Sequence, residues 1–321
     1  MIVITGAAGF IGSHLCRKLN FHGIKNIILV DDFTQELKRK NWKSLEYTDK
    51  IQREHFFDWA AQNVQHIDFI YHLGARTDYF STENDIFEML NVDYSQRVWS
   101  FAATKGIPLI YASSYFTNII PHTSHLLPHT SHLLPHTSHL LPHTSHLSPL
   151  TSYLSPPATS LYAQSKYIFD KWIDKQAQTP PLWAGLKFFQ VYGKNEAHKE
   201  ENASVVYKIF QKYAENAPEI CVEKNIIQDY IYVNDVTKVL YYFLNHAPQS
   251  GIYEVGTGFA RSLHSIVEAM NKATKRTVKL ILEHQNEDPF VSQANFAQLR
   301  KYAYKQAFLS LEQGIKAMVR G

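Results

Sequence analysis

Three features of the chain predict an α/β fold in which helices cover both faces of a parallel sheet. Short apolar runs alternate with longer segments of helical periodicity through the first third of the sequence. A glycine-spaced turn at residues 6–12 joins the first apolar run to the first helical segment, and Asp31 and Asp32 close the second run. This order is typical of a Rossmann-type, doubly wound sheet. We expect it to be followed by a smaller C-terminal α/β domain that binds substrate.

The first third contains four short apolar runs and two segments of helical spacing. Such runs are typical of parallel strands that are buried on both faces. The longer segments should form helices that cover the sheet. We therefore expect strands at residues 2–5, 26–30, 68–73 and 107–112, and helices at 10–22 and 84–105.

The remainder of the chain continues the alternation less regularly. We expect helices at 160–178, 203–215, 236–244, 263–275 and 309–319, and strands at 183–189 and 226–233. Thr159 or Ser160 should cap the first of these helices. We assign residues 1–189, with about 226–258, to a nucleotide-binding domain, and residues 190–225 and 259–321 to a substrate-binding domain.

Composition limits the classes of function. The chain has 321 residues, 45% of them hydrophobic, and a formal net charge of +3. This charge is too small to indicate binding to nucleic acid or to a membrane surface. Cys16 and Cys221 are too few for a disulfide framework, so we expect a cytoplasmic protein.

A heptad repeat interrupts the domain. The unit Pro-His-Thr-Ser-His-Leu-Leu begins at Pro121 and recurs at Pro128, Pro135 and Pro142. A proline in every heptad excludes a coiled coil, so residues 121–157 are predicted to be an extended or disordered low-complexity insert. Its four His-x-x-His pairs have the spacing of zinc or nickel ligands. We expect no metal, because no Cys or acidic side chain accompanies the pairs.

The glycine turn predicts a nicotinamide dinucleotide site. Gly6, Gly9 and Gly12 would let the backbone approach a pyrophosphate at the N-terminus of a helix. Asp31 and Asp32 stand where an acid commonly binds the adenosine ribose. The basic residues that follow these acids are either a solvated face or partners for a 2′-phosphate, and the second reading favours NADP over NAD. They are Lys38, Arg39, Lys40 and Arg53.

A second motif predicts proton transfer. Tyr162 and Lys166 lie four residues apart, on one face of the helix expected from residue 160. A cation beside a tyrosine lowers the pKa of the phenol and makes it a usable base. Ser114, at the end of the strand expected near 107–112, could hold a substrate oxygen while the proton moves. The alternative for all three residues is a purely structural role.

These motifs carry a resemblance to the extended short-chain dehydrogenases/reductases. Over nearly the whole chain, the sequence resembles the ADP-L-glycero-D-manno-heptose 6-epimerases of that superfamily. The glycine turn and the Tyr-x-x-x-Lys motif mark only the superfamily. The segment Glu196-Ala197-His198-Lys199, after residues 188–193, selects the epimerase family.

The resemblance implies a reaction and a cofactor. The cofactor would take a hydride from C6″ of ADP-D-glycero-D-manno-heptose, leaving a ketone, and return it to the opposite face, in lipopolysaccharide inner-core precursor synthesis. Tyr162 and Lys199 would serve as the proton acceptor and donor on the two faces. Lys166 would orient the ribose and tune Tyr162, and burial and neighbouring cations would lower the pKa of Lys199. Members of the family form homo-oligomers, typically pentamers.

The resemblance also implies individual contacts. Besides the three glycines, the cofactor contacts would be Phe10, Ile11, Asp31, Asp32, Lys38, Arg53, Leu73, Gly74, Ala75, Arg76, Thr77, Asn91, Tyr162 and Lys166. The substrate contacts would be Ser114, Gln190, Val191, Lys199, Glu201, Lys208 and Gln228.

Several of these substrate positions depart from the family. Gln190 replaces an asparagine, Glu201 a serine and Lys208 a histidine, and Gln228 replaces an arginine that binds diphosphate. The heptad insert lies where the family has a loop that lines the substrate site. Two alternatives therefore remain: another nucleotide-sugar epimerase, dehydratase or reductase, or a catalytically impaired NADP-binding copy. Retention of Lys199 favours the 6-epimerase, because a 4-epimerase needs no second base.

Overall fold

A computed structural model gives the fold, and it describes residues 1–120, 160–224, 226–246, 248–284, 290–302 and 304–320. The heptad insert, its histidine pairs and Thr159 lie outside the described residues. Among the residues described, no helix is both long and apolar enough to span a bilayer.

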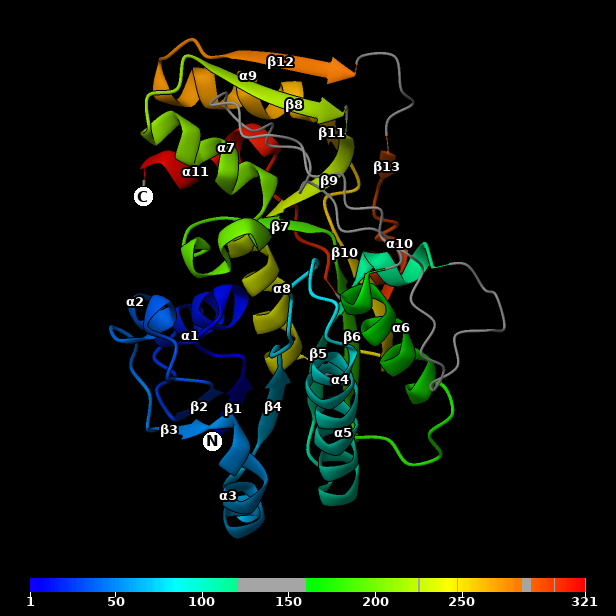
Figure 1. Ribbon diagram of the computed structural model, residues 1–321. Coiled ribbons are helices and arrows are strands. Elements are labelled where there is room, and N and C mark those ends of the chain that lie inside the picture. The colour runs from blue at the N-terminus through cyan, green and yellow to red at the C-terminus, as the bar shows by residue number, and fades with distance from the viewer. Residues whose placement is uncertain (121–159, 225, 247, 285–289, 303, 321) are drawn as a thin grey trace.

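A seven-stranded parallel sheet forms the larger half of the molecule, at the bottom of Figure 1. The strand order is β10-β6-β5-β4-β1-β2-β3, which confirms the predicted Rossmann-type fold. Its strands are β1 (Ile2–Thr5), β2 (Ile27–Asp31), β3 (Asp49–Gln52), β4 (Phe69–His72), β5 (Leu109–Ser114), β6 (Trp183–Phe188) and β10 (Gly251–Val255).

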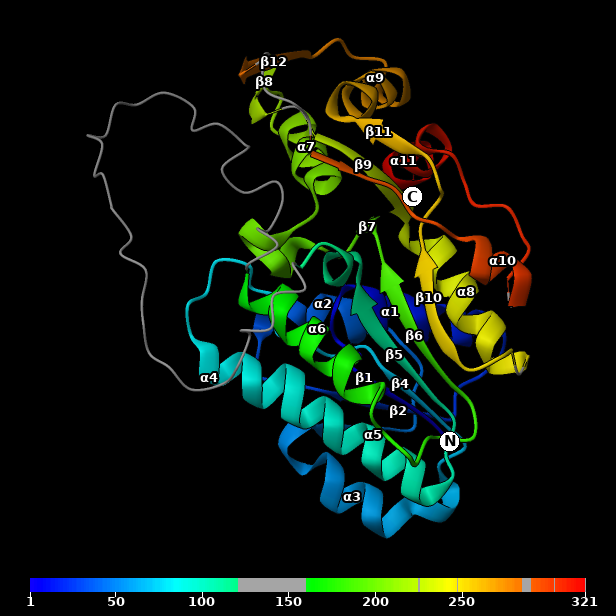
Figure 2. The ribbon, with the colours of Figure 1, turned by 90° about the vertical axis from the view of Figure 1, so that its right-hand side faces the viewer.

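Helices cover both faces of this sheet because its strands are apolar on both sides. Ile4 points to the face where Leu15 of α1 and Leu240 of α8 are packed, whereas its neighbour Val3 points to the other face, against Trp99 of α5. Figure 2 shows these two layers with the sheet between them. The first layer holds α1 (Phe10–Phe21), α8 (Val233–Asn245) and α10 (Ala297–Tyr302), and the second holds α3 (Phe56–Asn63), α5 (Tyr94–Lys105) and α6 (Leu161–Ile173).

The smaller half has its own sheet and its own core. One sheet contains β7 (Gln190–Tyr192), β9 (Ile226–Tyr232), β11 (Ala260–Ser262) and β13 (Phe290–Ser292), and a two-stranded sheet contains β8 (Glu219–Lys224) and β12 (Lys279–His284). Helices α7 (Val205–Ala214), α9 (Leu263–Thr274) and α11 (Leu311–Arg320) pack against them. Ile209, Met270 and Ile315 lie at the centre of this core.

The chain crosses between the halves more than once. β9 falls in the range 226–258 that we grouped with the nucleotide-binding domain, but it pairs with β7, β11 and β13 in the smaller sheet. The chain returns at Val233, where α8 begins, and β10 then adds the last strand to the large sheet. The chain therefore returns to the larger half at residue 233, where α8 begins, and not at residue 226.

The predicted elements agree with the structure where the periodicity was strong. All four early strands and the helices at 10–22 and 236–244 are confirmed within a few residues. Ser160 is the N-cap of α6, since its Oγ accepts a hydrogen bond from Ala163 N (3.2 Å). The helix predicted at 84–105 is instead three segments, because a π-helical turn at Glu88–Asp93 separates α4 (Asn84–Phe87) from α5. The short α2 (Arg39–Trp42), β3 and α3 were not predicted.

Two glycines bring the first strand, the first helix and β4 into contact. Gly6 has φ +71°, and a Cβ there would lie 2.5 Å from the backbone of Gly74, which follows β4. A Cβ on Gly12 would lie 2.2 Å from the carbonyl oxygen of Gly6. The turn therefore needs glycine at both positions for steric reasons alone.

We expect Gly12→Ala to lower the free energy of unfolding by about 2 kcal/mol or more, because its Cβ meets rigid backbone. Gly23→Ala is the matched control: Gly23 has φ +78° but nothing within 4 Å of the added Cβ. Gly23→Ala should lower the free energy of unfolding by only about 1 kcal/mol, the cost of placing a side chain on a left-handed backbone. Urea unfolding measures both, and equal losses would contradict the packing explanation.

Candidate functional site

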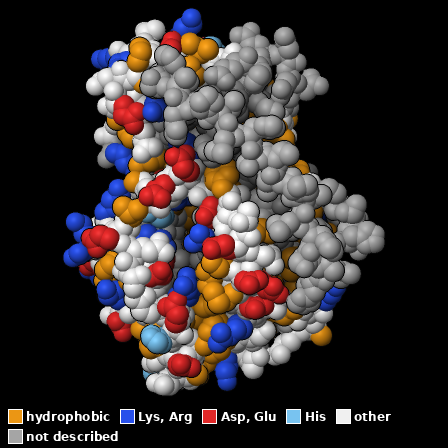
Figure 3. All heavy atoms as spheres, in the orientation of Figure 1, with side chains coloured by type: hydrophobic (Ala, Val, Ile, Leu, Met, Phe, Trp, Pro, Cys, Tyr) orange, Lys and Arg blue, Asp and Glu red, His pale blue; other side chains and the backbone are white. Residues whose placement is uncertain are grey.

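A cleft of about 440 Å³ opens at the carboxyl ends of the large sheet's central strands, where the two halves meet. Of the predicted site residues, those that line it are Gly6, Gly9, Phe10, Ile11, Gly12, Asp31, Lys38, Arg53, Leu73, Gly74, Ala75, Arg76, Thr77, Ser114, Tyr162, Lys166, Gln190, Val191, Lys199 and Glu201. Asp32, Asn91, Lys208 and Gln228 do not line it. Around it, basic and acidic side chains are interspersed on the face seen in Figure 3.

The glycine turn forms one end of the cleft and fits a dinucleotide pyrophosphate. Gly9 is the N-cap of α1 and has no side chain to satisfy the first N–H groups of that helix. These donors and the positive end of the helix dipole are suited to an anion. The space that a Cβ on Gly6 or Gly12 would fill is taken by backbone, so the floor of the turn is bare main chain.

Asp31 and Asp32 have different surroundings. Asp31 is buried, accepts a hydrogen bond from Ala8 N (2.9 Å) and pairs with Lys38 Nζ (2.9 Å). Asp32 turns away from the cleft and accepts hydrogen bonds from Thr34. The Thr34 hydroxyl is the main cause that lowers the pKa of Asp32. Asp31 is therefore the acid of the cleft, and Asp32 stabilises the following turn.

Asn91 lies behind the cleft wall. Its side chain accepts from Arg76 N (2.7 Å) and donates to Arg76 O (2.9 Å) and to Ser165 Oγ (2.9 Å). It is fully buried in the π-helical turn, a feature often found at functional sites. Asn91 thus ties the cleft-lining segment 73–77 to α6, one residue from Lys166.

A buried histidine at the end of β4 links β1 to α5. Thr5 Oγ1 lies 2.7 Å from His72 Nδ1, and His72 Nε2 lies 2.9 Å from Ser95 Oγ. Burial lowers the pKa of His72 to about 3, so the ring is neutral. Because Ser95 already donates to Asn91 O (2.7 Å), His72 Nε2 carries the hydrogen and Nδ1 accepts from Thr5. No pattern in the sequence pointed to this residue.

Tyr162 lies in the cleft wall beside Ser114 and Tyr79. Its ring meets that of Tyr79 edge-on, with centroids 5.2 Å apart. We expected a neighbouring cation to lower the pKa of the Tyr162 phenol, and this is wrong for the protein alone. Burial raises that pKa, and the Ser114 side chain opposes the change by hydrogen bonding.

Lys166 explains why the phenol is not tuned as expected. Its Nζ donates to the carbonyl oxygen of Ala112 (2.9 Å), at the end of β5. The side chain is only 3% exposed, and burial lowers the pKa of Lys166 to about 8, against the opposing effect of Asp170. Asp170 in turn accepts from Ser113 Oγ (2.7 Å) and Tyr111 Oη (3.1 Å).

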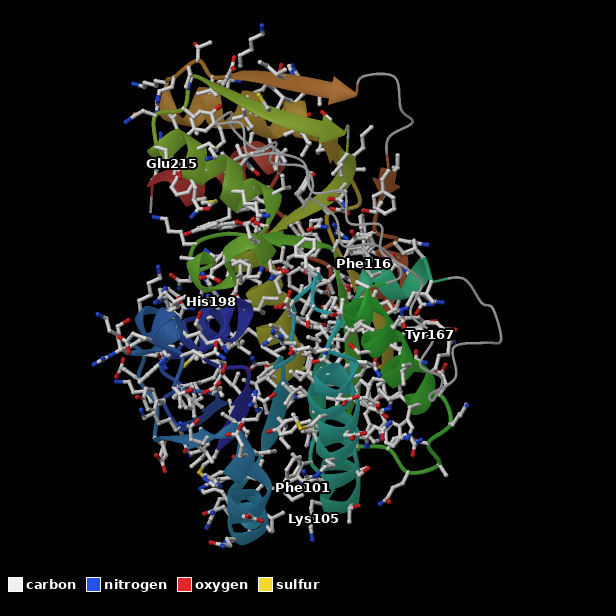
Figure 4. The ribbon with its side chains drawn as sticks, in the orientation of Figure 1. Phe101, Lys105, Phe116, Tyr167, His198 and Glu215 are labelled. Atoms are coloured by element: carbon white, nitrogen blue, oxygen red, sulfur yellow. The ribbon has the colours of Figure 1, made fainter. Side chains whose placement is uncertain are left out.

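Lys199 enters the cleft from the smaller half. It belongs to the 3-10 segment Ala197–Asn202, and its Nζ is 2.9 Å from Glu196 Oε2 and 5.0 Å from the centroid of the Phe10 ring. We expected neighbouring cations, and Lys208 does interact electrostatically with Lys199, but the nearest charged partner of Lys199 is this buried anion. The adjacent His198, labelled in Figure 4 between the two halves, is neutral because burial lowers its pKa to about 4.

The end of the cleft where we expect substrate is arranged around a tyrosine. Tyr115 Oη accepts hydrogen bonds from Gln190 Nε2 and Gln228 Nε2, both at 3.1 Å. Gln228 is fully buried behind Tyr115. Lys208, also buried, lies 3.7 Å from Glu201 Oε2, whose side chain is mostly exposed. Gln228 therefore does not line the cleft, but it binds the phenol of Tyr115, which does.

Tyr79, Tyr115 and Glu196 contact the predicted site residues but were missed from the sequence. Tyr115 directly follows Ser114, and Glu196 belongs to the segment that selected the family. The spacing of Tyr115 and of Glu196 in the sequence does not distinguish them from ordinary packed or solvated residues. Only the tertiary contacts assign them to the site. Within the described residues, no group of three or more His, Cys, Asp or Glu side chains is placed to hold a metal ion.

The buried ammonium of Lys166 predicts a pH dependence of stability. Its pKa is about 8 in the folded protein and near 10.5 when unfolded, so the folded state binds fewer protons between these values. Relative to Lys166→Met, the cofactor-free protein should gain stability as pH rises from about 8 to 10, by at most about 1.4 kcal/mol per pH unit. Urea unfolding of both proteins measures the difference in their free energies of unfolding. A difference that does not change with pH would contradict the burial of a charged amine.

The comparisons with known proteins agree with this geometry. Residues 2–256 match the NAD dependent epimerase/dehydratase family. The chain is 33% identical to an ADP-L-glycero-D-manno-heptose-6-epimerase of Fusobacterium nucleatum, covering 100% of this chain and 97% of that protein. It is 28% identical to the protein of the same name from Brachyspira hyodysenteriae, over 98% of this chain and 96% of that protein.

Solved structures share the fold. The Helicobacter pylori ADP-L-glycero-D-manno-heptose-6-epimerase superposes with a TM-score of 0.74 at 22% identity, covering 99% of this chain and 94% of that one. A UDP-N-acetylglucosamine 4-epimerase of Methanobrevibacter ruminantium gives a TM-score of 0.75 at 20% identity, covering 99% and 96%. With its fold, its cleft and its full-length relatives taken together, the chain belongs to the NAD dependent epimerase/dehydratase family, among the ADP-L-glycero-D-manno-heptose-6-epimerases.

Proposed function

We propose that this protein converts ADP-D-glycero-D-manno-heptose to ADP-L-glycero-D-manno-heptose at C6″, with NADP as cofactor, in the synthesis of the lipopolysaccharide inner core. The observation that carries the proposal is that Tyr162 and Lys199, from opposite halves, line one cleft with the glycine turn. In this mechanism Tyr162 transfers the hydroxyl proton of one epimer and Lys199 transfers that of the other. The names of the full-length relatives support the same sugar.

The proposed roles follow from the contacts. A bound nicotinamide would supply the hydride acceptor and donor. The N-terminus of α1 binds the pyrophosphate, and Lys166 binds the ribose from its anchored position on Ala112 O. Ser114 holds the reacting oxygen beside Tyr162. Tyr162 Oη takes the hydroxyl proton on one face of the reacting carbon. Lys199 Nζ transfers the hydroxyl proton on the opposite face.

The surroundings of Asp31 support NADP over NAD. Its carboxylate already accepts from Ala8 N and pairs with Lys38, which neutralises a group that would repel a 2′-phosphate. Lys38 and Arg53 both line this end of the cleft and are suited to pair with that phosphate.

Lys38→Met should weaken NADP binding about tenfold or more while leaving NAD affinity within about threefold, because only NADP carries the 2′-phosphate. Calorimetric titration with each dinucleotide measures the two affinities. Lys40→Met is the matched control, since Lys40 is exposed and does not line the cleft. Equal losses for NADP and NAD would contradict the assignment of Lys38.

The reaction is tested by incubating the protein with ADP-D-glycero-β-D-manno-heptose and following inversion at C6″ by NMR. Lys199→Ala should reduce inversion by about a hundredfold or more while NADP stays bound, because one face of the carbon loses its proton-transfer group. Full activity in Lys199→Ala would remove this residue from the mechanism. A wild-type protein that binds NADP without inverting C6″ would exclude this substrate.

A second candidate is a related nucleotide-sugar epimerase, dehydratase or reductase. It is favoured by the burial of Gln228 behind Tyr115, at a position where the heptose epimerases have a diphosphate-binding arginine. Turnover of a UDP-sugar in place of the ADP-heptose would identify it. We further propose that the larger half binds cofactor, that the smaller half binds substrate, and that the protein is a cytoplasmic homo-oligomer, a pentamer as in the family.

A further inference from the structure

Glu196 is a fully buried carboxylate in contact with Lys199. Its Oε2 accepts hydrogen bonds from Lys199 Nζ (2.9 Å) and Ser204 N (2.8 Å). Its Oε1 accepts from Ser204 Oγ (2.7 Å) and Gly193 N (3.1 Å). All four partners are donors, and an ionised carboxylate is the form that accepts from all of them.

These contacts connect three parts of the smaller half. Gly193 follows β7, Ser204 is the N-cap of α7, and Lys199 lies on the segment between them. That segment includes Glu200 at φ 47° and ψ −120°, a strained conformation for a residue with a side chain. Glu196 thus closes the loop that carries Lys199 and holds it in one conformation.

Lys199 Nζ lies between an anion and an aromatic ring, and the cation Lys208 of α7 also interacts with it electrostatically. Its side chain is only 17% exposed, with the Glu196 carboxylate at 2.9 Å and the Phe10 ring centroid at 5.0 Å from Nζ. An anion stabilises an ammonium, and so does the face of an aromatic ring. Phe10 belongs to the glycine turn, so the ammonium lies at the border between the predicted cofactor and substrate ends of the cleft.

We propose that Glu196 is a positioning residue that holds Lys199 as an ammonium, so that Lys199 acts as the proton donor when the ketone is reduced. The inference rests on the proposed function. In that step the carbonyl carbon gains the returning hydride, and the carbonyl oxygen gains a proton from Lys199 Nζ, which becomes a neutral amine. Because Tyr162 has taken the hydroxyl proton in the preceding oxidation, one turnover leaves Tyr162 with one proton more and Lys199 with one fewer, and proton exchange with water restores both groups.

The first test needs no substrate and is therefore independent of the proposed function. It measures how fast an amine-specific acylating reagent labels Lys199 in the full-length protein, by peptide mass spectrometry with Lys166 as internal reference. Glu196→Gln removes the anion, so the fraction of neutral amine should rise and labelling should be about tenfold faster. Ser204→Ala, which keeps the carboxylate, should change it less than about twofold. Equal labelling in wild type and Glu196→Gln would overturn the proposal.

The second test uses inversion at C6″. Glu196→Gln should lower kcat about a hundredfold with KM within about threefold, as expected for a group that acts in the chemical step. In Glu196→Ala, added formate should restore activity and slow the labelling of Lys199, whereas neutral formamide should do neither. Equal rescue by formamide, or full activity in Glu196→Gln, would count against a role for the charge.

The Glu196→Ala comparison also covers the case in which Glu196→Gln fails to fold, because formate and formamide are then compared on one protein. The two tests separate the two proposals. If labelling responds to Glu196 as expected but the wild type does not invert C6″, the proposed substrate is wrong and the pairing of Glu196 with Lys199 stands. If the wild type inverts C6″ and labelling ignores Glu196, only the present inference fails.

Discussion

The close approach of backbone at Gly6 is the contact on which the site depends. The chain of β1 meets the chain after β4 at Gly74, and α1 begins against the Gly6 carbonyl, with no room for a Cβ on Gly6 or Gly12. This brings one helix N-terminus and two strand ends to one place. An anion-binding surface of main-chain N–H groups at the carboxyl edge of a parallel sheet is the consequence.

Buried polar side chains then fix the loops around that edge. Asn91 binds the backbone of Arg76 in the segment after β4, and His72 links β1 to α5. Asn41 bridges the glycine turn at Ala8 O (3.0 Å) to His198 (3.2 Å). Loops expose backbone groups that no sheet or helix satisfies, so side chains must satisfy them where water is excluded. Glu196 does the same for the loop that carries Lys199. Hydrogen bonds therefore hold the loops at the end of the cleft where a cofactor is expected, and polar contacts join the two halves.

The large sheet was predictable because its signals are local. A few neighbouring residues are enough to predict an apolar strand, a glycine turn or the start of a helix. Gly6 in the turn and Ser160 at the N-cap of α6 are examples. β3, with the sequence Asp-Lys-Ile-Gln, was missed because its exposed and half-buried side chains show no apolar run. The position of β9 in the smaller sheet was missed because strand pairing depends on partners distant in sequence.

The sequence by itself determined the fold class, the place of the glycine turn and the identity of most residues around the cleft, because these follow from periodicity and from steric demands of single residues. Only the tertiary structure decided the charge environment of those residues. Burial raises the pKa of Tyr162, Lys166 binds a carbonyl instead of tuning that phenol, and Lys199 pairs with the anion of Glu196. Protonation depends on desolvation and on neighbours within a few ångströms, and the chain brings those neighbours together only when it folds.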